Sequence, residues 1–383
     1  MHIERFRVEV SDAALTDLHE RLARTRWPDQ LPGSRWDYGT DTAYLRELCD
    51  YWLASFDWRA AEAGLNAWPQ FVTTTGGQRL HFLHVRSAHP MARPLLLLHG
   101  WPSTSAEFLR IIGPLVDPTS HGGRVGHAFH VIAPSLPGFG WSGPTTDFGW
   151  STRRIATALI ELIEHLGYPR VGVHGTDFGS VVGTHLATAA PERLTGLHLT
   201  LLPSSLRPRD REPTPEERLV IAAQDAVRAE QSGYAAVQST TPQTLAHALV
   251  DSPAGQAAWI VEKFRSWTDC NGDLESTISR DELLANITTY WMTGTAGSSA
   301  RLYFEDRRDA APRRYVTVPT AYAAFPGDVY PASRTIAEDH YDVRRWTPMP
   351  RGGHFAALET PQLLVDDLRG FFADEPDEEG LPQ

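Results

Sequence analysis

A single carboxylate, Asp177, stands in a glycine-rich turn where it could act as a nucleophile. The surrounding stretch, residues 171–179, reads VGVHGTDFG and passes from a short apolar run to small residues. Gly175 and Gly179 flank the aspartate at the two positions where a cramped strand-to-helix reversal tolerates no bulky side chain. This layout is typical of a nucleophile elbow with aspartate in place of serine. The same aspartate could instead cap a helix, since Asp is a favoured N-cap residue.

An aspartate nucleophile would perform a different reaction from a serine. Serine attacks acyl groups, whereas a carboxylate can displace at saturated carbon and form an ester whose own carbonyl is open to water. Suitable electrophiles are therefore epoxides and alkyl halides. As the ester breaks, the backbone N–H groups of Trp101 and Phe178 would hold its oxyanion. An epoxide also needs a proton donor for its opening oxygen, and a tyrosine suits this because its phenol, with a pKa of about 10, stays protonated at neutral pH.

The stretches around Asp177 alternate between apolar runs and amphipathic segments. Residues 94–100, PLLLLHG, form a continuous apolar run of the kind found in parallel strands that are covered on both faces. A helix capped by Ser151 or Thr152 follows later, and others begin near Ser105 and Ser180. This alternation predicts an α/β fold with a mostly parallel sheet flanked by helices. The other expected strands are FVTTT and RLHFLHV, joined by a Gly76-Gly77 hairpin turn, and HVIAPSLPG, VGV, GLHLTLLP, TVPTAYAAF and RWTPMP.

Two segments interrupt the alternation and are predicted to be helical. The first is an N-terminal arm in which Ser11 and Thr42 could cap helices, and its tryptophans more often supply packing area than bind a ligand. The second is a polar helical cap inserted into the sheet domain. The predicted domains are the arm (1–69), the first part of the α/β core (70–203), the cap (204–314), the second part of the core (315–373) and a disordered acidic tail (374–383).

Four groups of polar residues follow the predicted strands directly. In open α/β sheets ligands bind beyond the carboxyl ends of the strands, so residues at these ends form one site. In chain order they are His99-Gly100-Trp101-Pro102, Asp177, Asp328 after AAFPG, and His354 after RGG. A nucleophile, an acid and a histidine in this order match the α/β-hydrolase fold. We therefore expect His354, oriented by Asp328, to activate the water that hydrolyses the ester.

Each member of this constellation has a structural alternative. Asp328 could merely order its turn, and Glu338 or Asp339 could compete with it for the role of the acid. His354 could be a loop histidine whose hydrogen bonds are satisfied locally. His99 receives no chemical role, because a histidine directly after an apolar strand more often fixes the loop through backbone hydrogen bonds.

Composition places the chain among ordinary globular proteins. It has 383 residues, 42% of them hydrophobic, and a net charge of −12, which argues against nucleic-acid binding. Cys49 and Cys270 are far apart and offer neither a disulfide framework nor metal-ligand spacing. Neither an apolar run of about 20 residues nor a hydrophobic signal core is present. These features predict a cytoplasmic protein without membrane contact, and we expect no metal or other cofactor.

Several longer stretches resemble one family in particular. The chain is similar to the microsomal-type epoxide hydrolases over about residues 3–372. The stretches that carry this resemblance are HGWPSTSAEF, PSLPGFGWS, GTDFGS, SGYAAVQSTTP, DSPAGQAAWIVEKF, YWMTGTAGSSARLYFE, AFPGD and RGGHFAALE.

The resemblance assigns roles to the acidic, histidine and tyrosine residues of the site. It implies Asp177 as the nucleophile, Asp328 and His354 as the charge relay, and Tyr234 and Tyr303 in the cap as the pair that binds the epoxide oxygen. Composition alone would not select these tyrosines, since Tyr234 otherwise reads as a loop aromatic and Tyr303 as helix packing. The resemblance also implies that the arm wraps round the core and cap. We therefore expect a soluble bacterial form without the membrane anchor of the vertebrate enzymes.

The chain departs from the family pattern beside the nucleophile. Family members usually have Gly and Trp there, where this sequence has Thr176 and Phe178. The backbone N–H of Phe178 survives the change, so the oxyanion hole should remain while the pocket lined by Trp101 and Phe178 changes shape. Some members also use Glu as the relay acid, where this chain has the shorter Asp328.

Two other functions remain open at this point. A haloalkane dehalogenase would share the nucleophile and the relay but needs halide-binding N–H donors, and Phe178 cannot supply one from its side chain. A non-catalytic binding protein could also use this fold. We expect a small hydrophobic or aryl epoxide and water as reactants. Detoxification and natural-product biosynthesis both fit the sequence, and a homodimer is one option for the oligomeric state.

Overall fold

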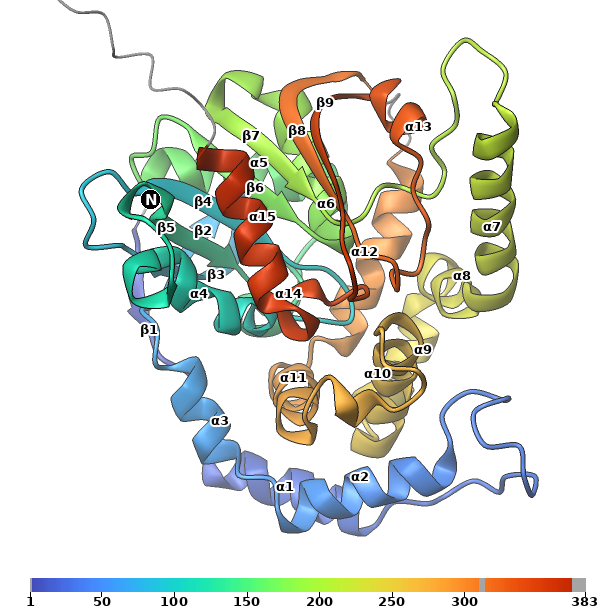
Figure 1. Cartoon of the computed structure of the whole chain (residues 1–383). Coiled ribbons are helices and arrows are strands. Elements are labelled where there is room, and N and C mark those ends of the chain that lie inside the picture. The colour runs from blue at the N-terminus through green and yellow to red at the C-terminus, as the bar shows by residue number, and fades with distance from the viewer. Residues whose placement is uncertain (1, 310–313, 374–383) are drawn as a thin grey trace, which may run out of the picture.

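One nine-stranded sheet forms the centre of the computed structural model, which describes residues 2–309 and 314–373 (Figure 1). The strand order is β1-β2-β3-β5-β4-β6-β7-β8-β9. Pairs from β5 to β9 are parallel and those from β1 to β5 are antiparallel, which makes the sheet mostly parallel, as predicted. The strands are β1 (Glu4–Phe6), β2 (Gln70–Thr75), β3 (Gln78–Val85), β4 (Arg93–Leu98), β5 (Phe129–Pro134), β6 (Val171–Gly175), β7 (Leu194–Leu199), β8 (Val316–Ala324) and β9 (Tyr341–Pro348).

Helices cover both faces of this sheet, as the continuous apolar run in β4 predicts. Leu95 and Leu97 pack into one buried cluster, whereas Leu96 and Leu98 pack into another on the opposite face. The predicted cap residue Ser151 accepts a hydrogen bond from the backbone N–H of Arg154. The helices of the core are α4 (Leu109–Val116), α5 (Thr152–His165), α6 (Asp177–Ala189), α13 (Arg334–Glu338), α14 (Ala356–Glu359) and α15 (Pro361–Ala373), with a 3₁₀ turn at Ser105–Phe108 ahead of α4.

The predicted hairpin and the predicted insertion are both present. Thr75 pairs with Gln78, so Gly76 and Gly77 alone form the turn, with φ angles of 54° and 81° that glycine adopts readily. Between β7 and β8 the chain is helical, and Figure 1 shows these helices gathered beside the sheet. They are α7 (Pro215–Gln231), α8 (Gly233–Thr240), α9 (Pro242–Leu249), α10 (Pro253–Trp267), α11 (Arg280–Thr293) and α12 (Ala296–Arg308).

The N-terminal segment contributes a strand as well as helices. Its helices α1 (Asp12–Ala23) and α2 (Thr42–Ala54) lie beside α10, and α3 (Trp58–Leu65) lies beside α11 (Figure 1). Ser11 caps α1 as predicted, but Asp41, not Thr42, caps α2, because its carboxylate accepts from the N–H groups of Ala43 and Tyr44. The segment predicted to be helical also contains the strand β1, which pairs with β2 at the sheet edge.

The expected acidic tail at 374–383 lies outside the described residues. Within residues 2–309 and 314–373, no helix is long and apolar enough to cross a membrane.

Candidate active site

The turn between β6 and α6 holds Asp177 in a constrained backbone. Its φ angle is 47°, in the left-handed region that non-glycine residues rarely adopt. A Cβ atom on Gly175 would lie 2.4 Å from the carbonyl oxygen of Gly179, and one on Gly179 would lie 2.0 Å from that of Leu98. Both glycines are therefore required sterically, as predicted. The helix begins at Asp177 itself, earlier than the predicted start at Ser180.

The carboxylate of Asp177 is bound by the backbone that follows another strand, β4. Oδ1 accepts a hydrogen bond of 2.8 Å from the backbone N–H of Trp101, which follows β4. Thr176 occupies the N-cap position of α6 without a side-chain capping bond. Oδ2 lies 3.5 Å from Nε2 of His354. The two carboxylate oxygens thus face different partners, a backbone donor and an imidazole.

His354 and Asp328 form a close buried pair. Nδ1 of His354 lies 2.8 Å from Oδ1 of Asp328, and the two side chains are only 2% and 3% exposed. Burial alone would lower the pKa of His354, but the carboxylates of Asp328 and Asp177 raise it well above its usual value. The competing acids lie elsewhere, since Glu338 pairs with Arg334 and Asp339 pairs with Arg211.

The two predicted tyrosines reach the same place from different cap helices. Tyr234 lies in α8, where a loop was expected, and Tyr303 lies in α12. The ring of Trp101 stacks on Tyr234 with 5.0 Å between centroids, and its centroid is 5.9 Å from that of Tyr303. Phe178 packs edge-on against Tyr303 at 4.6 Å. The cap therefore brings both phenols beside the two residues expected to supply the oxyanion donors.

Both phenols are in surroundings that keep them protonated. Burial raises the pKa of Tyr234, and the nearby charge of Asp177 raises it further. The pKa of Tyr303 is likewise raised well above its usual value by burial, with contributions from Tyr234 and Asp177. A neutral phenol beside a carboxylate can donate a proton to a third group, which is the role expected of these residues.

The remaining polar residues at the strand ends have structural partners. Nδ1 of His99 is 3.0 Å from the carbonyl oxygen of Gly100, and Nε2 accepts from the N–H of Leu136 at 3.1 Å. His99 therefore holds two backbone segments, as expected. The hydroxyl of Thr176 donates to the carbonyl oxygen of His354 at 3.4 Å. The two departures from the family pattern, Thr176 and Phe178, both touch partners within the site.

One aromatic residue of the site was not predicted from the sequence. Trp267, at the end of α10, lies 5.4 Å from the ring of Tyr234 and 5.0 Å from that of His354, measured between centroids. Its carbonyl oxygen also accepts from the N–H of His354 at 2.9 Å. Helical spacing could place Trp267 on a face of α10, but only the fold shows that this face meets His354, the predicted relay histidine.

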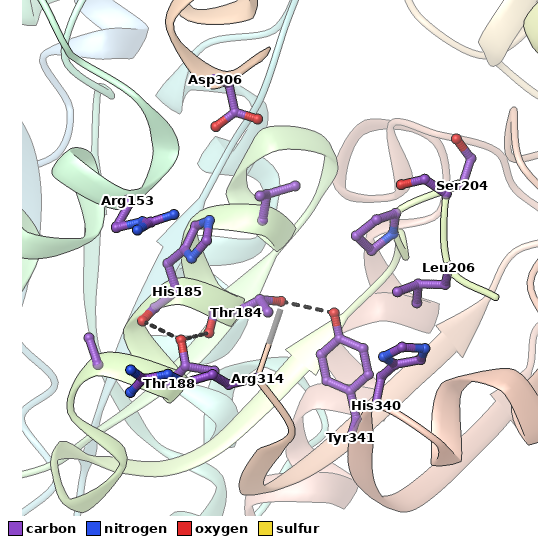
Figure 2. A pocket seen from close by; sticks show the side chains of 14 residues that line it. Arg153, Thr184, His185, Thr188, Ser204, Leu206, Asp306, Arg314, His340 and Tyr341 are labelled. Carbon is purple, nitrogen blue, oxygen red and sulfur yellow. Dashed lines mark hydrogen bonds between the residues drawn. The ribbon is translucent and has the colours of Figure 1, made fainter. Parts of the chain in front are cut away.

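A cavity of about 510 Å³ lies apart from these residues (Figure 2). It is lined by α6, by the loop after β7 and by the start of β9, where Thr184 and Tyr341 share a hydrogen bond of 3.2 Å. Arg153 in its wall pairs with Asp309 at 3.0 Å. None of the predicted catalytic residues lines this cavity. Among the described residues no group of three or more His, Cys, Asp or Glu side chains could hold a metal ion.

Behind the loop that carries Trp101 lies a buried acid, Glu107. Its Oε2 accepts a hydrogen bond of 2.5 Å from the hydroxyl of Ser103. Burial raises the pKa of Glu107 from its ordinary value of 4.5 to about 7, although the bond from Ser103 acts in the opposite direction. Between these two pH values the unfolded chain releases the proton while the folded chain retains it, so this residue lowers stability as pH rises through that window.

Replacing Glu107 by glutamine is therefore expected to stabilise the protein at alkaline pH. Glutamine stays neutral at all these pH values. The difference in free energy of unfolding between variant and wild type should therefore be larger at pH ~8.5 than at pH ~5, by about 2 to 3 kcal/mol in favour of the variant. Urea unfolding of both proteins at the two pH values measures this difference. An identical difference at both pH values would show that Glu107 does not titrate in this window.

Known proteins resemble this chain over nearly its whole length. The sequence matches the family described as "Epoxide hydrolase N terminus" over residues 3–108 and the "alpha/beta hydrolase fold" family over residues 93–248. A Stigmatella aurantiaca protein named "Putative epoxide hydrolase" is 46% identical over 97% of this chain and 84% of its own length. Epoxide hydrolase 1 of Sus scrofa is 37% identical over 96% of this chain and 88% of its own.

Solved structures with these names share the fold. The epoxide hydrolase of Aspergillus niger superposes with a TM-score of 0.86 and 29% identity, covering 97% of this chain and 96% of that one. The juvenile hormone epoxide hydrolase of Bombyx mori gives a TM-score of 0.84 and 29% identity, covering 97% of this chain and 94% of that one.

Proposed function

Because the chain belongs to the microsomal-type epoxide hydrolase family, with the α/β-hydrolase fold, we propose that it opens its epoxide through an ester on Asp177. The observation that carries this mechanism is the placement of the two Asp177 oxygens. Oδ1 is bound by the N–H of Trp101 at 2.8 Å, and Oδ2 lies 3.5 Å from His354. One oxygen can thus remain on a backbone donor while the other attacks carbon.

In the first half-reaction, Oδ2 of Asp177 attacks an epoxide carbon and forms an ester. The bond between that carbon and the epoxide oxygen breaks, and the oxygen takes a proton from Tyr234 or Tyr303. The positions of both phenols beside Trp101 support this role. Esterification also removes the negative charge of Asp177, which had helped to raise the pKa of His354. His354 then gives its proton to the phenolate and becomes a base.

In the second half-reaction, neutral His354 takes a proton from water while the water oxygen attacks the ester carbonyl. The negative charge that develops on Oδ1 is stabilised by the N–H of Trp101 and by that of Phe178. Phe178 lies in the first turn of α6, where backbone N–H groups lack intrahelical partners and the helix dipole favours negative charge. The bond between the acyl carbon and Oδ2 then breaks, and Oδ2 leaves in the diol with the proton of the hydroxyl that the water added. Asp177 is again a carboxylate and His354 is protonated, so the net change is addition of one water.

The proposed substrate is a small hydrophobic or aryl epoxide. Aromatic side chains cluster beside Asp177, because the ring of Trp101, whose N–H binds the carboxylate, lies against those of Tyr234, Tyr303 and Trp267. Such a wall favours apolar groups through burial of their surface. Halide release has weaker support, because Phe178 offers no side-chain N–H and phenols suit an oxygen leaving group better.

Removing the hydroxyl groups of Tyr234 and Tyr303 tests this function. Wild-type protein should convert styrene oxide to its diol and release no halide from haloalkanes. Tyr234→Phe and Tyr303→Phe should each slow diol formation by about 10- to 100-fold, and the double variant by about 10³-fold or more, because general-acid catalysis then disappears. Chromatography of the diol under single-turnover conditions measures these rates, with thermal melts as a check on folding.

Two outcomes would contradict the proposal. Halide release by a wild type that leaves epoxides untouched would identify a dehalogenase. Full activity of the folded double variant would remove the proton-donor role from the tyrosines.

A further inference from the structure

Lys263 is the only lysine of the chain, and it is buried in α10. Its side chain is 6% exposed. Lysine is rarely buried to this extent unless its charge has partners. The other 34 of the 35 lysine and arginine residues are arginines, so the position combines an unusual residue type with an unusual environment.

The ammonium group of Lys263 lies over the ring of a proposed proton donor. Nζ is 4.5 Å from the ring centroid of Tyr234 and 5.7 Å from that of Trp267. Lys263 and Trp267 are four residues apart on α10, so they occupy the same helix face. The remaining partner is Glu262, whose Oε2 is 2.5 Å from Nζ.

Lys263 differs in sign from the other charged groups named around Tyr234. Asp177 and Glu262 are negative and disfavour a charged phenol, whereas Lys263 is positive and lies over the ring face. Every other cation–π contact among the described residues uses arginine. A lysine ammonium is a compact point charge, which acts more strongly on a nearby developing charge than a delocalised guanidinium does.

We propose that Lys263 is a positioning residue for Tyr234, holding its ring and stabilising the negative charge that develops on it as the epoxide opens. This inference rests on the proposed function, since it concerns the proton transfer of the first half-reaction. The attraction between an ammonium and an aromatic face grows as the ring becomes phenolate-like, so it favours the transition state over the ground state. The second half-reaction, in which Tyr234 transfers no proton, should be independent of Lys263.

Substitutions of Lys263 and Glu262 should change the rate of ester formation differently. Lys263→Met should slow ester formation by about 10-fold, and Lys263→Arg should recover most of that loss because it retains a cation. Glu262→Gln should match or exceed the wild type, because the cation then acts on Tyr234 without a competing carboxylate. Rapid-quench single-turnover kinetics with styrene oxide measures ester formation and ester hydrolysis separately, and hydrolysis should be unchanged in all three variants.

A second readout tests the contact without using activity. Protein labelled with ¹⁵Nζ-lysine should give one lysine side-chain signal, which should shift in Tyr234→Leu because the ring current is removed. An unshifted signal would overturn the contact. Equal losses in Lys263→Met and Glu262→Gln would indicate a purely structural ion pair and would overturn the inference, as would an unchanged rate in folded Lys263→Met. A wild type that opens no epoxide would instead defeat the proposed function, and the inference with it.

Discussion

Replacing Asp177 by asparagine or alanine is expected to reduce diol formation by at least about 10⁴-fold, to the background rate. An amide nitrogen cannot attack the epoxide carbon, although asparagine can keep the hydrogen bond from the Trp101 N–H that now holds Oδ1 at 2.8 Å. The asparagine variant should therefore remain folded and still bind substrate. Steady-state diol formation measures the loss, and peptide mass spectrometry checks that the asparagine has not been hydrolysed back to aspartate.

An oxygen-labelling experiment separates the covalent route from direct attack by water. With enzyme in excess, a single turnover in H₂¹⁸O should give a diol without ¹⁸O, because its new oxygen comes from the Asp177 carboxylate. The label should appear in the peptide that contains Asp177. Asp251→Asn is a suitable control, since this exposed carboxylate pairs with Arg21 at the surface and should be dispensable. A labelled diol in the first turnover would show that Asp177 is not the nucleophile.

The elbow and the core could be predicted because their signals are local. A strand, two glycines and a helix follow each other within residues 171–189, and the steric demand for glycine arises within the same turn. The apolar run of β4 likewise reports burial on both faces directly. Element boundaries are harder to predict, as the earlier start of α6 shows, because residues beside an elbow satisfy helix and turn patterns alike.

The cap side of the site could not be derived from local patterns. Tyr234 and Tyr303 lie in different helices, and which helix faces meet Trp101 depends on how α8 and α12 pack against each other. Resemblance to a family supplied these two residues. The strand β1 was missed for a similar reason, since three residues carry little periodicity and gain their structure from pairing with β2.

Replacing His354 by alanine is expected to stop the reaction after the ester has formed. Asp177 can still attack, because Oδ2 needs no base and the tyrosines still donate, but no group remains to activate water. Hydrolysis of the ester should slow by about 10³- to 10⁴-fold, while ester formation should change much less. Intact mass spectrometry should then show one added substrate mass per chain, and peptide mapping should place it on Asp177.

The stoichiometry of this adduct distinguishes a relay from a merely structural histidine. One equivalent of ester should form in a burst in His354→Ala, and none in the Asp177→Ala/His354→Ala double variant. Asp328→Asn should accumulate the ester to an intermediate level, because the histidine remains but loses the carboxylate that lies 2.8 Å from its Nδ1 and fixes its orientation. A folded His354→Ala variant that releases diol at the wild-type rate would contradict the mechanism, whereas one that binds substrate without forming ester would place His354 in the first half-reaction instead.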